Sequence, residues 1–194
     1  MNMNAQAQAV FDFWFAGTDT QRREWFQKDD AFDREIERRF GGEIAQALEG
    51  GLRQWDAEGP QAALARILLL DQFCRNVHRG TPLAFAGDHL ALQAALDMIE
   101  AGDDQLLPPL QRAFVYLPLE HAEDMAMQEQ AVALFSRLVE GEGGNQGLAG
   151  MLDFAKRHRE VIRRFGRFPH RNAILGRPST PEELEFLKQP GSGF

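Results

Sequence analysis

Hydrophobic and polar residues are spaced along the chain as they are in amphipathic helices. Ala, Leu, Glu, Gln and Arg dominate, and no run of alternating Val, Ile or Thr indicates a strand. Glycine and proline clusters divide the chain into segments of helical length. The predicted helices span residues 4–16, 20–27, 29–40, 43–49, 60–78, 87–101, 107–116, 119–140, 147–165 and 181–188. The last helix has the clearest start, because Thr180 can cap it, Pro181 suits its first position and Glu183 completes a capping box.

Short helices joined by short loops predict an all-α fold of about nine or ten helices. Antiparallel helix pairs of this kind stack into an α-solenoid or a compact bundle. No repeat of 34 residues is visible in the sequence. The length of 194 residues predicts one all-α domain over residues 1–194. We expect the tail at 190–194 to be frayed.

Composition and charge exclude several classes of protein. The chain is 44% hydrophobic and 26% charged, which is typical of a globular domain. A net charge of −8 argues against nucleic-acid or anionic-membrane partners. The single Cys74 cannot form an internal disulfide, and the most apolar run, residues 67–70, is far too short to span a membrane. No secretory signal is visible, so we expect a soluble cytoplasmic protein.

The acidic total hides a basic segment between Lys156 and Arg177. It contains eight basic residues against one acid, Glu160, and therefore carries a charge of +7. Seven of the eight are arginines, which bind carboxylate and phosphate groups through two hydrogen bonds. The favoured interpretation is that the segment packs against acidic neighbours and neutralises itself. Nucleic-acid binding is poorly supported, because no aromatic-rich basic module accompanies the segment.

Polar residues continue the apolar faces of two predicted helices when positions are taken at 100° each. In the helix over 119–140 they are Glu120, His121, Asp124 and Gln128. In the helix over 60–78 they are Asp71, Arg75, His78 and Arg79. Buried polar groups need hydrogen-bond partners, so these residues form a structural network, a binding or catalytic site, or a metal site. The sequence has no HExxH motif, no cysteine cluster and no phosphate-binding loop.

Two further features add polar groups to this set. His158 lies in the apolar row of the helix over 147–165, where a histidine is more often a satisfied core residue than a ligand. The following segment, residues 165–177, is interrupted by glycine and proline and anchored by Phe165 and Phe168. It carries four hydrogen-bond donors: Arg167, His170, Arg171 and Asn172.

Three motifs occur together in this chain: DQFCRNVHRG at 71–80, HAEDMAMQ at 121–128 and FGRFPHRNAILGRPSTPEE at 165–183. With VFDFWFAG at 10–17, they make the chain similar to the bacterial domain-of-unknown-function family 924. The resemblance covers essentially the whole chain. It implies a tetratricopeptide-repeat-like, right-handed α-α superhelix, and it implies no known activity.

The family pattern marks residues in each motif. These are Asp71, Gln72, Arg75, Asn76 and Arg79, then His121, Glu123, Asp124 and Gln128, then Gly166, Arg167, Phe168, Pro169, His170, Arg171 and Asn172. One position departs from the pattern, because Cys74 stands where the family usually has proline. A proline there would kink or end the helix, so the resemblance leaves the local bend in doubt.

The resemblance and the helical phases agree on a polar cleft. We expect it to be lined by Asp71, Arg75, Asn76, Arg79, His121, Asp124, Gln128, Arg167, His170, Arg171 and Asn172. Such a cleft can bind an anionic small molecule or an acidic peptide, without a cofactor or metal. The alternative is a hydrolase or group-transfer enzyme. In it His121 is the general base, Asp124 orients it, and the arginines stabilise negative charge.

Overall fold

The computed structural model describes residues 3–17, 20–141 and 145–193, and every regular element in these ranges is helical. The predicted all-α fold is therefore confirmed. The α-helices are α1 (Ala5–Phe15), α2 (Asp30–Leu48), α3 (Pro60–Leu68), α4 (Cys74–Val77), α5 (Asp88–Ala101), α6 (Pro109–Glu120), α7 (Met125–Gly141), α8 (Gln146–Phe165) and α9 (Pro181–Leu187). Short 3₁₀ turns join them: η1 (Arg23–Trp25), η2 (Arg53–Ala57), η4 (Pro82–Phe85), η5 (Asp103–Leu106) and η6 (Pro169–Arg171).

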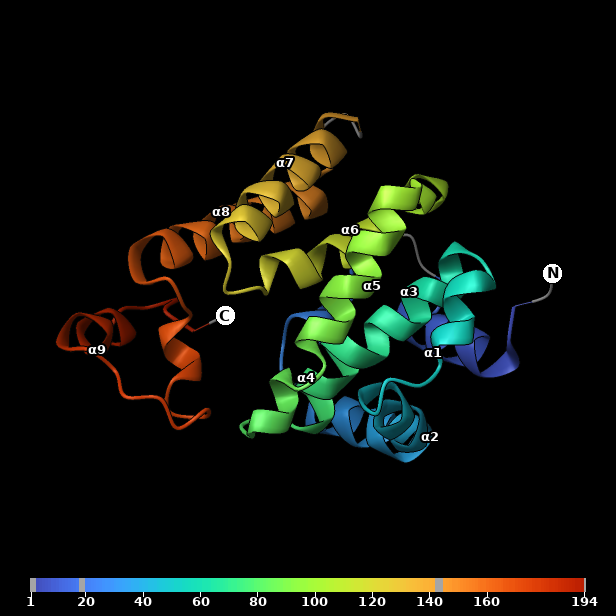
Figure 1. Cartoon of the computed structure of the whole chain (residues 1–194), viewed down its shortest axis with the longest axis horizontal. Helices are drawn as coiled ribbons and strands as arrows, with labels where there is room; N and C mark the ends of the chain where they lie inside the picture. The colour runs from blue at the N-terminus through green and yellow to red at the C-terminus, as the bar shows by residue number, and fades with distance from the viewer. Residues whose placement is uncertain (1–2, 18–19, 142–144, 194) are drawn as a thin grey trace.

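The helices pack mainly against helices that are one or two places away in the chain. Helix α3 contacts α1 and α5, α5 contacts α6, and α7 contacts both α6 and α8. In Figure 1 helices α1 to α5 form the right-hand part, and α7 and α8 lie together at the upper left. The C-terminal segment, with η6 and α9, lies at the left end. This arrangement is compatible with a superhelix. That the superhelix resembles those of tetratricopeptide-repeat proteins stays a prediction.

Helix α3 is the centre of the core, as its apolar sequence predicts. Every residue from Ala62 to Leu68 is buried. Beside it Trp14 packs against Trp25, Phe73 and Phe114, with ring centroids 5.4–5.8 Å apart. Aromatic clusters of this kind bury large areas and fix the relative positions of their helices.

The predicted helix over 60–78 contains a π-helical turn, η3 (Leu69–Phe73), between α3 and α4. The backbone N–H of Cys74 donates to the carbonyl of Leu69, five residues earlier. The helix therefore changes its winding here without a proline. Such turns shift the side chains that follow them and are frequent at functional sites. Asp71 lies within this turn.

Two predicted helices, 29–40 and 43–49, are a single helix, α2, that runs through Gly41 and Gly42. An interior glycine costs a helix roughly 1 kcal/mol relative to alanine. The buried face made by Ile36, Phe40 and Ile44 continues across the glycines. Burying each such side chain stabilises the fold by about 1.5–3 kcal/mol, which outweighs the local cost.

The predicted helix over 119–140 is also wrong at its start. Helix α6 ends at Glu120 and α7 begins at Met125, so residues 121–124 form a turn. Asp124 caps α7, because its Oδ1 accepts a hydrogen bond of 3.0 Å from the N–H of Met127. Counting 100° per residue therefore cannot assign residues 120–124 and the residues of α7 to one face of a common helix.

The C-terminal segment has a small core of its own. Val161, Ile162 and Phe168 are buried together, and Phe186 of α9 packs on Phe165 with ring centroids 5.1 Å apart. The capping box predicted at Thr180 and Glu183 is present. The tail expected to fray at 190–194 is held at Ser192, which is buried and donates to the carbonyl of Leu187; Phe194 lies outside the described residues. Within the described ranges, no helix combines the length and apolarity that crossing a membrane requires.

Candidate functional site

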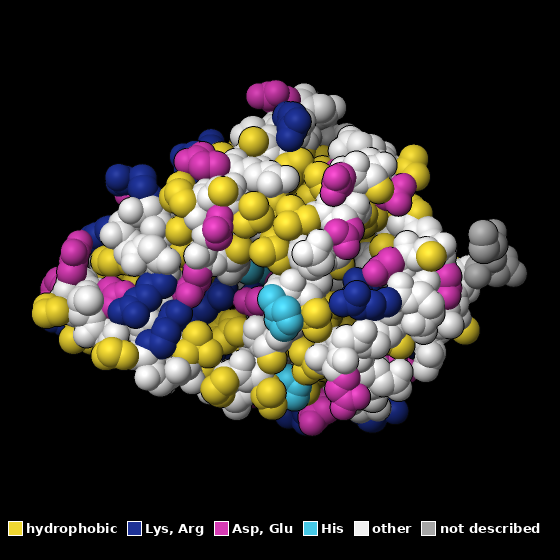
Figure 2. Space-filling view, in the orientation of Figure 1, with side chains coloured by type: hydrophobic (Ala, Val, Ile, Leu, Met, Phe, Trp, Pro, Cys, Tyr) yellow, Lys and Arg dark blue, Asp and Glu magenta, His cyan; other side chains and the backbone are white. Residues whose placement is uncertain are grey.

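Two adjacent cavities share part of their walls, and the second of them reaches the C-terminal segment through His170, Arg171 and Ile174. The first, here called the aromatic cavity, has a volume of about 300 Å³, and Trp25, Phe26 and Phe154 are in its wall. The second, the arginine cavity, has a volume of about 240 Å³ and is lined by Arg75, Arg79, Gly80, Ala84, Phe85, His121, His158, His170, Arg171 and Ile174. Four side chains line both cavities: Arg75, Arg79, His121 and His158. In Figure 2, Lys and Arg side chains gather over the C-terminal segment at the left, with apolar side chains beside them.

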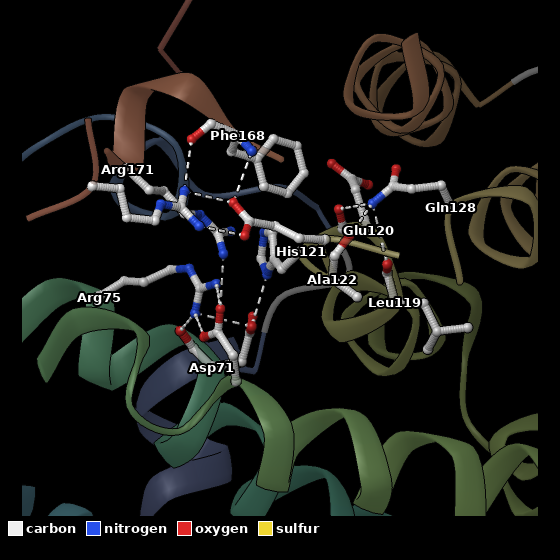
Figure 3. A network of polar contacts seen from close by, with 12 residues as sticks. Asp71, Arg75, Leu119, Glu120, His121, Ala122, Gln128, Phe168 and Arg171 are labelled. Atoms are coloured by element: carbon white, nitrogen blue, oxygen red, sulfur yellow. Dashed lines mark hydrogen bonds and ion pairs between the residues drawn. The ribbon is translucent and has the colours of Figure 1, made fainter. Parts of the chain in front are cut away.

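Asp71 is the deepest charged group next to these cavities, with 1% of its surface exposed. Its Oδ1 lies 2.7 Å from Nδ1 of His121 and 3.0 Å from Nη1 of Arg75, and its Oδ2 accepts from the Gln72 amide at 2.6 Å. Burial acts to raise the pKa of Asp71, but Arg75 and His121 together hold it below its usual value. The carboxylate is therefore ionised at neutral pH (Figure 3).

His121 follows the last turn of α6 and faces the π-helical turn. Burial and the charge of Arg75 lower its pKa, and they outweigh the opposing effect of Asp71. The imidazole is therefore neutral at pH 7. A neutral ring next to a carboxylate carries its proton on the nitrogen that faces the carboxylate, here Nδ1. Nε2 of His121 is then left as a proton acceptor.

Arg171 of η6 is the most deeply buried arginine of the arginine cavity, at 6% exposed. Its guanidinium carbon lies 4.6 Å from the ring centres of both Phe85 and Phe168. Its one hydrogen bond within the described chain runs from Nη1 to Oδ2 of Asp88, at 3.2 Å, and its Nε is buried with no partner there. Burial and the charge of Arg75 lower the pKa of Arg171 to about 10.

The remaining two histidines of the arginine cavity come from α8 and η6. Nδ1 of His158 lies 3.0 Å from Oε1 of the buried Glu120 and 2.9 Å from the carbonyl of Phe154. The His121 and His158 rings are 6.1 Å apart between centroids. Burial, followed by the charge of Arg171, lowers the pKa of His170 to about 4. At neutral pH this cavity thus presents charged arginines beside at least two neutral imidazoles, those of His121 and His170.

Comparison with known proteins identifies the family. The sequence matches the bacterial protein family of unknown function DUF924 over residues 10–191. The chain belongs to DUF924. Its fold resembles the solved structure of ATU0120, a protein of unknown function from Agrobacterium tumefaciens. The TM-score is 0.82 and the sequences are 42% identical, over 96% of this chain and 99% of that one. No curated protein has a significantly similar sequence.

The DUF924 motifs bring seven of the predicted site residues to the two cavities. Asp71 lies behind the shared wall, and the lining residues are Arg75, Asn76, Arg79, His121, His170 and Arg171. Asp33 of α2 holds two of them in place. Its carboxylate accepts from the Asn76 amide at 2.7 Å and from the Arg79 guanidinium at 3.0–3.2 Å.

Four predicted site residues have structural roles instead. Asp124 is exposed and caps α7, so the carboxylate that orients His121 is Asp71. The buried Gln128 amide donates to the carbonyls that end α6, at 2.6 Å from that of Glu120. Arg167 donates to both carboxylate oxygens of Glu183, at 2.6 and 2.8 Å. The Asn172 amide donates to Ser179 Oγ at 3.0 Å.

Most of the basic segment is neutralised within the protein. Acidic side chains from α7, α8, α9 and the turn before α7 form ion pairs with its arginines: Arg159–Glu129, Arg163–Glu160, Arg164–Glu182, Arg167–Glu183 and Arg177–Glu123. Hydrogen bonds hold the pKa of Glu183 down at about 2, with that of Arg167 the largest contribution. The favoured interpretation of this segment, packing against acidic neighbours, accounts for these five arginines, and Arg157 pairs with Asp153 in the same way. Arg171 differs, because its one acidic partner, Asp88 at 3.2 Å, leaves its Nε without a hydrogen bond within the described residues.

Sequence reasoning missed the residue that fixes the C-terminal segment. Glu123 accepts hydrogen bonds from the backbone N–H of Phe168 at 2.7 Å and from Arg177 at 2.6 and 2.9 Å. Glu123 is not among the residues that the helical phase assigned to the apolar face of the predicted helix over 119–140, although the family pattern marks it. Phe85 in the short turn η4 and Asp88 at the first position of α5 were missed as well, because nothing in the sequence shows that they contact Arg171.

Cys74 does not contribute a nucleophile. It is buried, and burial raises its pKa to about 12, so the thiolate that attacks electrophiles is not formed at neutral pH. Across the described residues, no group of three or more His, Cys, Asp or Glu side chains is arranged to hold a metal ion.

Proposed function

We propose that this DUF924 protein binds a small anionic molecule through a carboxylate or phosphate group in the arginine cavity. The observation that carries the proposal is the state of Arg171. This guanidinium is almost fully buried and lines the arginine cavity. It donates one hydrogen bond within the described chain, of 3.2 Å, to Asp88. Most buried charged donors in proteins have a hydrogen-bond partner. The buried Nε of Arg171 has none within the described residues and lies beside a cavity, so we infer that a bound acceptor completes its hydrogen bonding.

The charge distribution supports an anion at this position. The carboxylates that pair with the arginines, Asp33, Asp71 and Asp88, are absent from the cavity lining, whereas Arg75, Arg79 and Arg171 are part of it. The lowered pKa of Arg171 reflects the cost of holding it next to Arg75 in a buried place. An anion between the two guanidinium groups removes that cost and accepts their remaining hydrogen bonds.

Anion binding is expected to stabilise the folded protein. A ligand at about 100 times its dissociation constant adds about 2.7 kcal/mol, which raises the melting temperature of a domain of this size by roughly 5–10 °C. The measurement is a thermal melt with phosphate, citrate or a dicarboxylate, against chloride at matched ionic strength. The substitution Arg171→Met keeps the packing between Phe85 and Phe168 and is expected to abolish the saturable rise.

The matched control is Arg163→Met in the same basic segment. Arg163 is exposed and paired with Glu160, so this variant is expected to keep the full ligand response. If no anion in the screen produces a saturable rise in the wild-type protein, the cavity is not an anion site and the proposal fails.

A second candidate function, general-base catalysis, is favoured by one contact. The 2.7 Å bond between Asp71 and Nδ1 of His121 orients a neutral imidazole whose Nε2 can accept a proton from a water molecule or a substrate hydroxyl. Arg75 and Arg171 are placed to stabilise the negative charge that develops when that oxygen attacks an ester or phosphate group. In this mechanism Asp71 takes the role predicted for Asp124.

The substitution His121→Gln separates catalysis from binding. If the protein hydrolyses a carboxylic or phosphate ester, the loss of the general base is expected to lower kcat by roughly 10²–10⁴-fold. The anion-induced rise in melting temperature is expected to remain, because both guanidinium groups remain. The catalytic candidate fails if the variant keeps wild-type kcat on a substrate that the wild-type protein turns over.

A further inference from the structure

We infer that the bound anion is the head of a larger molecule whose flat apolar body occupies the aromatic cavity between Phe26 and Phe154. This inference rests on the proposed function and names the class of ligand: an aryl phosphate or an aryl carboxylate. It draws on the aromatic cavity, which anion binding by the arginines leaves unexplained.

The wall of the aromatic cavity contains apolar side chains that are largely buried in the folded protein. Trp25, Leu117 and Met151 come from three different elements and form part of the lining. Phe26 is 55% exposed and Phe154 is 49% exposed, and both line this same cavity. Exposed large apolar residues gathered around one concave wall are typical of a ligand-binding surface.

The two cavities are placed so that one molecule can fill both. Arg75, Arg79, His121 and His158 belong to both linings, so an anion bound to these side chains lies at the end of the aromatic cavity. Figure 3 shows the Arg75, His121 and Arg171 side chains pointing toward one another from three separate parts of the chain; Arg75 and His121 belong to the shared wall, and Arg171 belongs to the arginine cavity alone. A ligand with its charge here extends its body directly toward the apolar lining.

The lining also limits where the ligand carries charge. At the aromatic cavity, Glu24 and Lys28 have opposite signs, and the second acid of its lining, Glu120, lies 3.0 Å from His158. The lining of the arginine cavity contains three arginines and no acid. The ligand therefore has one anionic end and one apolar end, and ring stacking on Phe26 and Phe154 favours an aromatic body.

Isothermal titration of the intact protein with two pairs of probes tests this inference. Phenyl phosphate is expected to bind at least tenfold more tightly than inorganic phosphate, or benzoate at least tenfold more tightly than acetate. The pair with the larger gain identifies the head group. In the variants Phe26→Ser and Phe154→Ser the ratio within that pair is expected to fall toward one, while affinity for the small anion is unchanged.

Leu106→Ser is the matched control, since Leu106 is 70% exposed and lies in neither cavity lining. It is expected to keep the wild-type ratio. Equal binding of the small and the aryl anion overturns the inference and leaves the proposed function standing. If neither pair binds, the proposed function itself fails. A preference for the aryl probe that survives in both phenylalanine variants places the apolar body elsewhere and also overturns the inference.

Discussion

Replacing Asp71 with alanine is expected to lower the free energy of unfolding by roughly 3–5 kcal/mol. Asp71 is almost fully buried and accepts from His121, Arg75 and Gln72 at distances of 2.6–3.0 Å. Alanine removes the carboxylate but leaves the partly buried guanidinium of Arg75 with part of its charge uncompensated. The loss is measured as the shift in the denaturant midpoint at pH 7.

The matched control for Asp71→Ala is Asp153→Ala on α8. Asp153 also pairs with an arginine four positions away, Arg157, at 2.6 Å, but both side chains are more than half exposed. An exposed pair of this kind contributes about 1 kcal/mol or less. A loss of that size for Asp71→Ala would mean that water replaces the carboxylate, and it would contradict a buried charge network at the π-helical turn.

The sequence predicts helices well where the signals are local. The start of α9 is predicted to the residue, because Thr180, Pro181 and Glu183 act within one turn. The prediction fails at α2, where two glycines indicated a break. Whether a helix crosses a glycine pair depends on how firmly its apolar face is buried, and the burial of Phe40 and Ile44 comes from other parts of the chain.

The boundary between α6 and α7 shows the opposite error, because the prediction ran one helix through the turn at residues 121–124. The predicted helix over 107–116 ends too early, because α6 continues through Pro118 to Glu120. Asp124 is a usual N-cap residue, but the apolar stripe of α7 could be extended backward past it without conflict. A phase of 100° per residue carries no information about where a helix begins. This error moved Asp124 into the predicted site and Glu123 out of it.

The convergence of the site could be predicted, but its pairing could not. Asp71, Arg75 and His121 are polar residues where apolar packing is expected, so each needs a partner, and they meet in the structure. Which carboxylate faces His121 depends on the shift in winding at η3, a tertiary feature that periodicity does not encode. The incomplete pairing of Arg171 could not be distinguished from the full pairing of its neighbours, because it depends on which acidic side chain reaches each arginine in the folded chain.

Acid is expected to destabilise this protein in two stages. The first lies between pH 6.5 and about 4, because the pKa of His170 falls from its ordinary value near 6.5 to about 4 on folding. Within this range the unfolded chain binds a proton that the folded protein does not, so stability falls as the pH falls. The loss for His170 is on the order of 3 kcal/mol. His121 acts in the same direction, since its pKa is also lowered.

The second stage lies below about pH 4 and belongs to the carboxylates. The pKa values of Asp71 and Glu123 are lowered in the folded protein, so their stabilising effect is present above their unfolded values and is lost as the pH falls further. Denaturant midpoints from pH 8 to pH 3 measure both stages. In His170→Gln the slope of the first stage is expected to decrease and that of the second to remain, whereas His89→Gln on the exposed surface of α5 is expected to follow the wild-type curve.

The acid response also depends on whether the arginine cavity is filled. His170 lines that cavity, and its pKa is low because it is buried beside Arg171, with no acid in the lining. A bound anion offsets the charge of Arg171 and favours the protonated imidazole, so it is expected to raise the pKa of His170 and flatten the first stage. Denaturant midpoints in saturating phosphate or benzoate, whichever binds, measure this coupling. A first stage equally steep with and without bound anion would place the anion away from His170 and contradict the assignment to the arginine cavity.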